Sequence, residues 1–187
     1  MSLRLATRLN SFRLKGGNKI SSADALKAVA AVKGIAAVEL NYPQHFVGES
    51  ADILKLAGDL GLAVTALNVR YDGPDFVHGA FTHPVKANRD KAIAISMEAA
   101  EVATKHGIDH VILWMGPDGY DYLFQADYAA LWQMEIDGFQ RVADVSPQTR
   151  VSVEYKPADP RRYALVRNMG EALVAVSDVD RKNFGVT

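Results

Sequence analysis

A short motif, a glycine followed by isoleucine or leucine, occurs three times in this sequence, each time where a helical pattern is followed by a run typical of a strand. It reads Gly34-Ile35-Ala36, Gly61-Leu62-Ala63 and Gly107-Ile108-Asp109. Glycine readily adopts the left-handed backbone conformation that ends many helices, and the apolar residue after it can enter a sheet. The repeated motif therefore predicts a regular alternation of helices and strands, which is typical of right-handed crossovers and a parallel sheet.

Hydrophobic periodicity around these junctions predicts the individual elements. We expect strands at residues 3–10, 35–40, 62–69, 108–114 and 151–157, and the start of a sixth at 183–187. We expect helices from a serine cap at Ser21 or Ser22 to Gly34, from a cap at Ser50 to Gly61, from Asn88 to Gly107, from about Tyr128 to Val145, and from Pro160 onward with Leu165, Met169, Leu173 and Val176 on the buried stripe.

Two architectures have this alternation, an open doubly wound sheet and a (βα)8 TIM barrel. No Gly-x-Gly-x-x-Gly or Gly-x-x-x-x-Gly-Lys loop follows any predicted strand, which argues against a nucleotide-binding doubly wound fold. Polar and aromatic residues gather after the second to fifth strands, and a ring of loops at one face is typical of a barrel. We therefore predict a single α/β domain over residues 1–187, a TIM barrel. A complete barrel takes about 250 residues, so five βα units and the start of strand six indicate a truncated one.

The composition narrows the classes of function. The 187 residues carry a formal net charge of −1 and include no cysteine. Such a chain has no strongly basic surface for nucleic acid, and it can form neither disulfides nor thiolate metal sites. It contains no run of 18 apolar residues, and Met1–Leu5 does not begin a signal peptide. We expect a cytoplasmic protein that binds neither membranes nor nucleic acid.

The strongest candidate for a chemical site is the stretch Val151-Ser152-Val153-Glu154-Tyr155-Lys156-Pro157. Alternate side chains share one face of a strand, so Glu154 and Lys156 are expected to point the same way at the carboxyl end of the fifth strand. In parallel α/β folds, ligands bind at that end. A carboxylate beside an ammonium group suits metal binding together with stabilisation of an oxyanion. A surface ion pair at a strand tip would have the same spacing.

Three segments carry a resemblance to a known family. They are Phe81-Thr82-His83-Pro84, Leu113-Trp114-Met115-Gly116-Pro117-Asp118-Gly119-Tyr120-Asp121 and Val153-Glu154-Tyr155-Lys156-Pro157. Together they resemble the xylose isomerase-like superfamily of TIM barrels, and within it the aldose–ketose isomerases for xylose and L-rhamnose. The resemblance in motifs runs from about Leu60 to Pro157, and the flanking residues fit in their strand–helix rhythm.

In that superfamily the strand-five glutamate is a divalent-metal ligand, and the lysine two residues on contacts the sugar oxygen that becomes negative. The resemblance implies these catalytic roles for Glu154 and Lys156, with Mn²⁺ or Mg²⁺ as the cofactor and Co²⁺ or Zn²⁺ as alternatives. Hard cations prefer carboxylate oxygens and can polarise the C1 and C2 oxygens of an open-chain sugar. Trp114 is expected either to stack on the sugar or to belong to the barrel core.

Three further residues are candidates for binding the substrate. His83 and His45 lie in loops of the predicted active face, where each could contact the sugar or hydrogen-bond its own backbone. Asn68, at the third strand, could bind a hydroxyl group or cap the strand. The isomerases in the resemblance carry a histidine at the tip of strand two, where this chain has Asn41. His110 lies early in its strand and is expected to be structural.

The favoured prediction is a metal-dependent isomerase or epimerase that acts on a monosaccharide, by aldose–ketose isomerisation at C1 and C2. The resemblance places the remaining metal ligands on strand six and beyond, so we expect this chain to be inactive alone. Open edges at the first and sixth strands predict a homo-oligomer. Two alternatives stay open: an endonuclease IV-like metal phosphoesterase on the same scaffold, and a non-catalytic carbohydrate-binding remnant.

Overall fold

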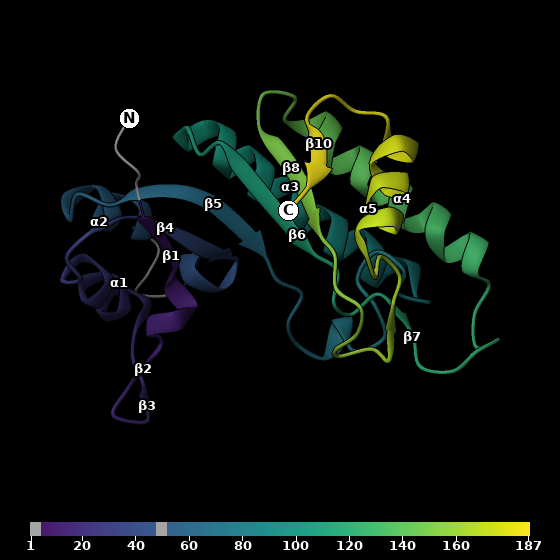
Figure 1. Cartoon of the computed structure of the whole chain (residues 1–187), viewed down its shortest axis with the longest axis horizontal. Helices are drawn as coiled ribbons and strands as arrows, with labels where there is room; N and C mark the ends of the chain where they lie inside the picture. The colour runs from purple at the N-terminus through teal and green to yellow at the C-terminus, as the bar shows by residue number, and fades with distance from the viewer. Residues whose placement is uncertain (1–4, 48–51) are drawn as a thin grey trace. The chain divides into compact units, whose positions relative to one another are not determined.

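The computed structural model of the chain describes residues 5–47 and 52–187. The chain divides into two compact units, residues 1–70 and residues 71–187, and each is described by itself (Figure 1). Two predictions fall outside the described residues: the helix cap at Ser50 and the first two residues of the first strand. The single domain expected from the sequence stays a prediction.

The first unit is built on three parallel strands. They are β1 (Leu5–Arg8), β4 (Ile35–Tyr42) and β5 (Ala63–Val69), in the spatial order β1-β4-β5. The helices of this unit are α1 (Ser22–Ala30) and α2 (Ile53–Asp59). The Ser21 hydroxyl accepts a hydrogen bond from the backbone N–H of Asp24 at 3.0 Å. This contact confirms Ser21 as the cap of α1, because it satisfies an N–H that has no partner within the helix.

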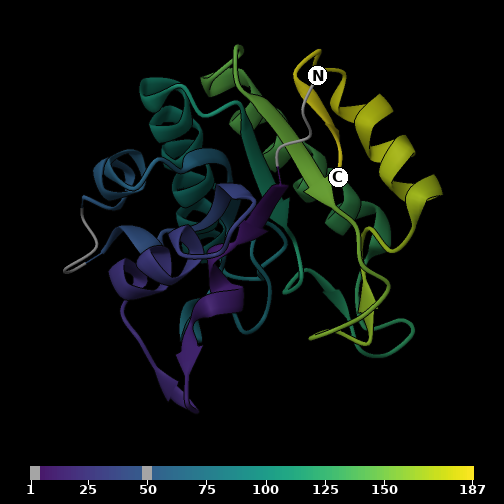
Figure 2. The same cartoon turned by 60° about the vertical axis from the view of Figure 1, so that its left-hand side comes forward.

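Between β1 and α1 the chain forms a small hairpin that the sequence pattern did not predict. The strand expected over residues 3–10 ends at Arg8, and a 3-10 turn, η1 (Leu9–Phe12), follows it. The strands β2 (Leu14–Lys15) and β3 (Asn18–Lys19) then pair antiparallel. Gly16 and Gly17 join them with φ angles of 57° and 82°, as a two-residue hairpin turn requires. Figure 2 shows this hairpin in purple, projecting from the first unit.

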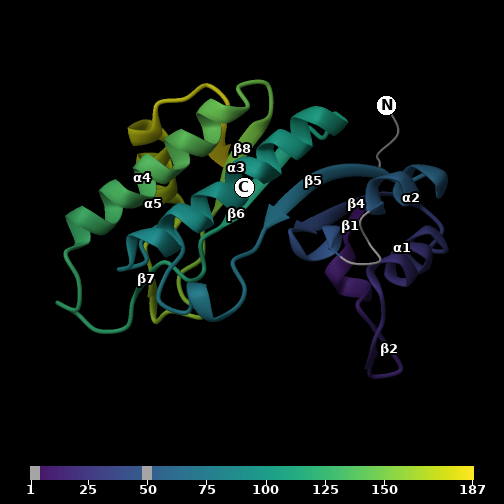
Figure 3. The ribbon, with the colours of Figure 1, turned by 180° about the vertical axis from the view of Figure 1, so that it is seen from behind.

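The second unit has three parallel strands with helices packed against one face. The strands are β6 (His110–Trp114), β8 (Arg150–Glu154) and β10 (Phe184–Val186), in that spatial order. The helices are α3 (Lys86–His106), α4 (Tyr128–Val145) and α5 (Met169–Val179). Figure 3 shows α3 and α4 in front of the strands, which stand in front in Figure 1. Phe139 of α4 and Phe184 of β10 are buried with ring centres 5.0 Å apart, so this face forms the core.

The two faces of β8 differ in polarity. Val151 and Val153 are almost completely buried on one face, and Ser152 and Glu154 point to the other because side chains alternate along a strand. On this second face the Ser152 Oγ lies 2.7 Å from the Nε2 of His110, a hydrogen-bonding distance. Polar groups thus gather on the face opposite the valines, and a binding site of the second unit can form there.

Two predictions about the fifth strand and fifth helix are wrong. The strand ends at Glu154, so Lys156 lies in the loop after it. The fifth helix begins at Met169 and not at Pro160, because Tyr163–Ala164 forms a strand, β9, that pairs antiparallel with β7 (Gly119–Tyr120). The predicted stripe is wrong in part: Met169 and Leu173 are 49% and 57% exposed, and the buried residues of α5 are Ala172, Ala175 and Val179.

The α/β class is confirmed. Across the described residues, six parallel strands alternate with five α-helices, which is consistent with a partial TIM barrel; closure of a barrel is not seen. In this part of the chain β1 pairs only with β4, and β10 pairs only with β8, so each has one edge without a strand partner. No helix in residues 5–47 and 52–187 has both the length and the apolar character needed to cross a lipid bilayer.

Candidate active site

Trp114 and Glu154 end two neighbouring strands of the second unit. Their Cα atoms are register partners in the parallel β6–β8 pair, so the two side chains leave the sheet on the same face. Both residues are partly exposed, whereas Val153 beside them is completely buried on the opposite face. The structure thus brings together the predicted metal ligand and the predicted stacking residue at the carboxyl ends of two strands.

Lys156 reaches the same place from the loop and not from the strand. Its backbone N–H donates to the carbonyl of Val166 at 3.1 Å, which fixes the chain just beyond β8. The Lys156 Nζ lies 5.3 Å from the centre of the Trp114 ring, a cation–π distance, and donates to Asp159 Oδ2 at 2.9 Å. The side chain is 36% exposed, so the ammonium group is oriented and still accessible to a ligand.

The described residues do not form a complete binding site for a divalent cation. Among residues 5–47 and 52–187, no group of three or more His, Asp or Glu side chains is placed to hold a metal ion. Mg²⁺ and related cations need about six ligands, several of them from carboxylates or substrate oxygens. Glu154 can supply one carboxylate of such a set, and the residues around it do not supply the others.

Asp118 organises the loop that carries His83. Its carboxylate is completely buried and accepts hydrogen bonds from three consecutive backbone N–H groups, those of Ala80, Phe81 and Thr82, at 2.8, 3.1 and 2.9 Å. The Thr82 hydroxyl also donates to it. Burial raises the pKa of Asp118, and these hydrogen bonds act in the opposite direction. One carboxylate thereby ties residues 80–82 to the loop after β6.

Glu135 is a second buried acid of this unit. It lies on α4 with no exposed surface, and neither carboxylate oxygen has a hydrogen-bond partner within the described part of the chain. Burial, and after it the charge of Asp118, raises its pKa well above the usual value of 4.5. The raised pKa favours the neutral carboxylic acid, because an unpaired buried carboxylate is costly to keep ionised.

His83 is buried, and both of its ring nitrogens have protein neighbours. The Nδ1 accepts a hydrogen bond from the backbone N–H of Val85 at 3.0 Å, and the Nε2 lies 3.2 Å from the Asn88 Nδ2. A substrate contact would require the ring to exchange one of these interactions. Binding of substrate by His83 stays a prediction.

In the first unit, Asn41 and Asn68 are register partners on β4 and β5 and are both buried. The Asn68 Nδ2 donates to the Glu39 Oε2 at 3.2 Å, and Glu39 shares its face of β4 with Asn41. Three polar side chains therefore lie together near the carboxyl ends of these strands. A hydroxyl contact by Asn68 stays a prediction, and Glu39 is an addition that the sequence pattern did not single out.

His45 is held inside the first unit. Its Nδ1 accepts a hydrogen bond from the backbone N–H of Asn41 at 2.8 Å, and only 7% of the residue is exposed. Burial lowers the pKa of His45 to about 4. A neutral imidazole agrees with the hydrogen bond, because an Nδ1 that accepts carries no proton. Contact of His45 with a substrate stays a prediction.

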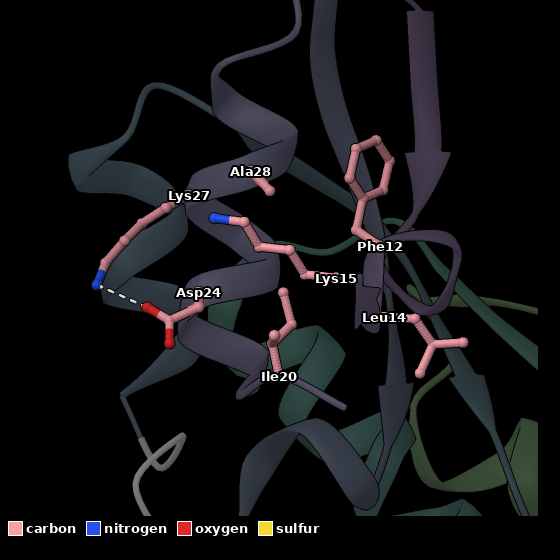
Figure 4. Close-up of a pocket in the computed structure, with 7 residues that line it drawn as sticks. All are labelled: Phe12, Leu14, Lys15, Ile20, Asp24, Lys27 and Ala28. Carbon is pink, nitrogen blue, oxygen red and sulfur yellow. Dashed lines mark hydrogen bonds and ion pairs between the residues drawn. The ribbon is translucent and has the colours of Figure 1, made fainter. Parts of the chain in front are cut away.

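A hollow of about 520 Å³ lies on the first unit between the β2–β3 hairpin and α1 (Figure 4). Its apolar lining is Phe12, Leu14, Ile20 and Ala28. Lys15 extends across it from the hairpin, and Lys27 pairs with Asp24 at 3.1 Å. The hydrogen bond from Lys27 is the main cause that lowers the pKa of Asp24. None of the predicted site residues lines this hollow, so it is not part of the candidate active site.

These observations define an α/β protein of parallel strands whose candidate site lies where two strands end. Residues 26–187 match the family model described as xylose isomerase-like TIM barrel. Because that match covers most of the sequence, the chain belongs to the xylose isomerase-like TIM barrel family. The family expected from the three sequence segments is confirmed.

Solved structures with a similar fold include enzymes that act on sugars. D-psicose 3-epimerase from Clostridium cellulolyticum H10, with D-tagatose, is 16% identical with a TM-score of 0.71 over 98% of this chain and 62% of that one. L-ribulose 3-epimerase is 15% identical with a TM-score of 0.72 over 99% and 60%. A xylose isomerase-like TIM barrel protein from Mycobacterium smegmatis, in complex with magnesium, is 15% identical with a TM-score of 0.68 over 98% and 63%. The chain thus spans between 60% and 63% of the length of these structures, and identities this low show a shared fold only.

Proposed function

We propose that this protein is a metal-dependent isomerase or epimerase of monosaccharides, with Glu154 and Lys156 as its catalytic residues. The observation that carries the proposal is their meeting at one edge: Glu154 is the register partner of Trp114, and the Lys156 Nζ lies 5.3 Å from the Trp114 ring centre. A carboxylate, a cation and an aromatic face suit a sugar, which offers hydroxyl groups and a face of C–H groups. The family and its epimerase neighbours support the same class.

Lys156 has the properties of a group that stabilises negative charge. Isomerisation or epimerisation next to a carbonyl places negative charge on the carbonyl oxygen in the transition state, and a preorganised cation lowers that barrier. Asp159 and Trp114 hold the Nζ in position before any substrate binds. An approaching oxygen would share the ammonium donors with Asp159, which is 81% exposed in its side chain and can move aside.

Glu154 is proposed as one ligand of a divalent cation, Mn²⁺ or Mg²⁺. Such an ion, when bound, polarises sugar oxygens as a Lewis acid. In the part of the chain that the structure describes, Glu154 belongs to no group of three or more acidic or histidine side chains that could hold the ion. We therefore propose that the 187-residue chain does not turn over sugars alone. Asn68, His45 and His83 are proposed as substrate-binding residues that would exchange an internal hydrogen bond for a sugar hydroxyl.

A titration of the protein with Mn²⁺ tests the proposal. Calorimetry should give saturable binding that Glu154→Gln weakens by at least about tenfold, since one charged ligand is lost. Glu98→Gln is the matched control, because Glu98 is an exposed glutamate on α3. Equal affinities for the two variants would refute the role of Glu154.

Incubation of a protein that carries a complete set of metal ligands with ketoses and aldoses, followed by chromatography of the products, tests the reaction itself. Interconversion of monosaccharides that depends on Mn²⁺ or Mg²⁺ is the expected result. Sugar binding with no conversion at any metal concentration would favour a non-catalytic carbohydrate-binding protein. Loss of conversion in Lys156→Gln with retained Mn²⁺ binding would separate the role of the lysine from that of Glu154.

We also propose that the chain forms a homo-oligomer. In the described residues β1 and β10 each have an edge without a strand partner, and open edges promote association. Light scattering of the 187-residue chain should give a mass above that of one chain. A strictly monomeric particle at all concentrations would exclude this association.

A further inference from the structure

The second unit contains a cavity of about 300 Å³ that none of the catalytic candidates lines. It lies between the first turn of α3, the first two turns of α4, and loop residues before α3, before α4 and after β8. Arg89 lines it from α3, and Leu131 and Met134 line it from α4. His78, Gln125 and Arg161 line it from the loops. Cavities of this size hold small organic ligands.

The lining is positively charged without a compensating carboxylate of its own. It contains two arginines and a histidine, and no aspartate or glutamate. Arg161 is neutralised from outside the lining, because its NH1 donates to Asp121 Oδ2 at 2.9 Å; its Nε and NH2 donate to the carbonyls of Pro117 and Val77, each at 2.9 Å. Arg161 therefore acts as a fixed part of the wall.

Arg89 differs from Arg161 because it forms no ion pair within the described ranges. Only its NH1 is used: it donates to the carbonyls of His83 and Pro84, at 2.7 and 3.1 Å. The Nε and NH2 have no protein partner in that part of the chain. A half-buried guanidinium with free donors and no ion-paired carboxylate is the group that proteins use to bind carboxylates and phosphates.

Gln125 supplies an oriented donor on the same lining. Its Oε1 accepts the backbone N–H groups of Asp121 and Tyr122 at 2.8 and 3.0 Å, which fixes the orientation of the amide. Its Nε2 has no partner among the residues that the structure describes. The His78 ring likewise has no hydrogen bond there; its ring centre lies 6.0 Å from that of His83. Arg89 is half-buried, and Gln125 and His78 are exposed, so three side chains with donors free of protein partners line one cavity that opens to solvent.

We propose that this cavity binds a small organic anion. Arg89, Gln125 and His78 would bind its carboxylate or phosphate group, and Leu131 and Met134 would contact its apolar body. The site is separate from Glu154, Lys156 and Trp114, and the proposal does not depend on the isomerase assignment. It assigns to this chain a binding site for a ligand other than a neutral sugar.

Calorimetric titrations of the 187-residue chain with three probes test the proposal. Benzoate and phenyl phosphate carry the two kinds of anionic group on the same apolar ring, and benzyl alcohol is the uncharged comparison. We expect saturable one-to-one binding of at least one anion, and the tighter of the two identifies the preferred group. Saturable binding of benzyl alcohol with the same affinity, or no saturable binding of either anion, would overturn the proposal.

Two variants locate the site. Arg89→Gln removes the unpaired charge and should weaken the tighter anion by at least about tenfold, a typical loss for a charge-assisted pair. Gln125→Glu keeps an oxygen that accepts the N–H groups of Asp121 and Tyr122, so the turn is retained. It replaces the amide donor by a negatively charged oxygen, and we expect a similar loss of anion affinity. Arg13→Gln, an exposed arginine of the first unit, should bind as the parent chain does.

The two variants also protect the test against a folding failure. In Arg89→Gln the carbonyl groups of His83 and Pro84 lose their donor. If circular dichroism shows that this variant is unfolded, the anion affinity of Gln125→Glu alone decides the question. Unchanged anion affinity in a folded Gln125→Glu would place the binding elsewhere and refute the assignment.

Discussion

The ammonium group of Lys156 lies over the ring of Trp114, with its Nζ 5.3 Å from the ring centre. The two residues are far apart in the sequence, and they meet because β6 and β8 are paired so that Trp114 is opposite Glu154. A lysine two residues past the end of β8 can then fold back over the neighbouring strand. This contact, and not an alternation of side chains along β8, is what places a cation at the edge of the sheet where Glu154 ends its strand.

Replacing Lys156 should therefore change the stability of the protein and the environment of the Trp114 ring. Lys156→Gln removes the cation–π contact and the ion pair with Asp159, and we expect a loss of about 0.5–1 kcal/mol in the free energy of unfolding. Urea denaturation checks this value. The emission of Trp114, recorded in a Trp132→Phe background, should change with it. Lys105→Gln at the exposed end of α3 is the control, and an equal effect there would show that the contact contributes nothing specific.

Asp118→Ala should strongly destabilise the second unit. The substitution leaves the N–H groups of Ala80, Phe81 and Thr82 buried without an acceptor. Each unsatisfied donor costs roughly 1–3 kcal/mol, so a total loss of at least about 3 kcal/mol is expected. Equilibrium unfolding measures the loss, and hydrogen exchange of these three amides locates it. Asp59→Ala removes only an exposed i,i+4 ion pair with Lys55 and should cost less than about 0.5 kcal/mol.

Glu135 predicts a loss of stability as the pH rises. Its folded pKa is raised well above 4.5 because the group is buried, so the unfolded chain releases this proton at lower pH than the folded chain does. The contribution of Glu135 is therefore undiminished below about pH 4.5 and falls as the pH rises from there to the folded pKa. The destabilisation of the protein between about pH 5 and pH 8 should be smaller in Glu135→Gln, because the amide has no proton to release on unfolding. Urea denaturation at about pH 5 and pH 8 tests the difference, and parallel losses in both proteins would contradict it.

The buried imidazole of His45 should make the protein less stable as the pH falls, the opposite direction to the effect of Glu135. Its pKa is lowered from 6.5 to about 4 by burial, so the folded protein keeps the ring neutral while the unfolded chain takes up a proton. The stability that depends on the neutral ring is complete above about pH 6.5 and is lost between pH 6.5 and about 4, to a total of up to about 3 kcal/mol. NMR titration of the imidazole nitrogens gives the midpoint directly. A midpoint near 6.5, or an unchanged pH slope in His45→Gln, would refute the assignment.

Sequence patterns correctly predicted the helices and strands whose capping residues and hydrophobic periodicity lie in or next to the element itself. The helix expected over Tyr128–Val145 has those bounds in the structure, because Asp127 caps it by accepting the N–H of Ala130 and its apolar residues repeat at helical spacing. The helix expected from Pro160 failed because the pairing of Tyr163 with Tyr120 keeps that backbone extended. Tyr120 precedes Tyr163 by 43 residues, and no pattern in the sequence around Tyr163 indicates this pairing.

The same reasoning separates what was found at the candidate site from what was missed. The motif residues Trp114, Glu154 and Lys156 were expected at one edge, and parallel register brings them there. Asp118 belongs to the same motif, yet its function as an acceptor for residues 80–82 depends on the fold of a distant loop. Glu135 could have been suspected from its place among the apolar positions of α4, one residue before Ile136, but its lack of partners depends on tertiary packing.

Alanine substitutions at two helical glycines, Gly138 of α4 and Gly58 of α2, separate the effect of core packing on stability from the effect of helix propensity. A Cβ at Gly138 would collide with the ring of Phe81, which is completely buried, whereas a Cβ at Gly58 of α2 would meet nothing within 4 Å. Alanine gains about 0.5–1 kcal/mol over glycine inside a helix, and Gly58→Ala should show this gain. In Gly138→Ala the collision should outweigh it and leave a net loss of roughly 1–3 kcal/mol, because the core cannot move aside freely. Urea denaturation of both variants measures the two effects, and a stabilised Gly138→Ala would refute tight packing of α4 on Phe81.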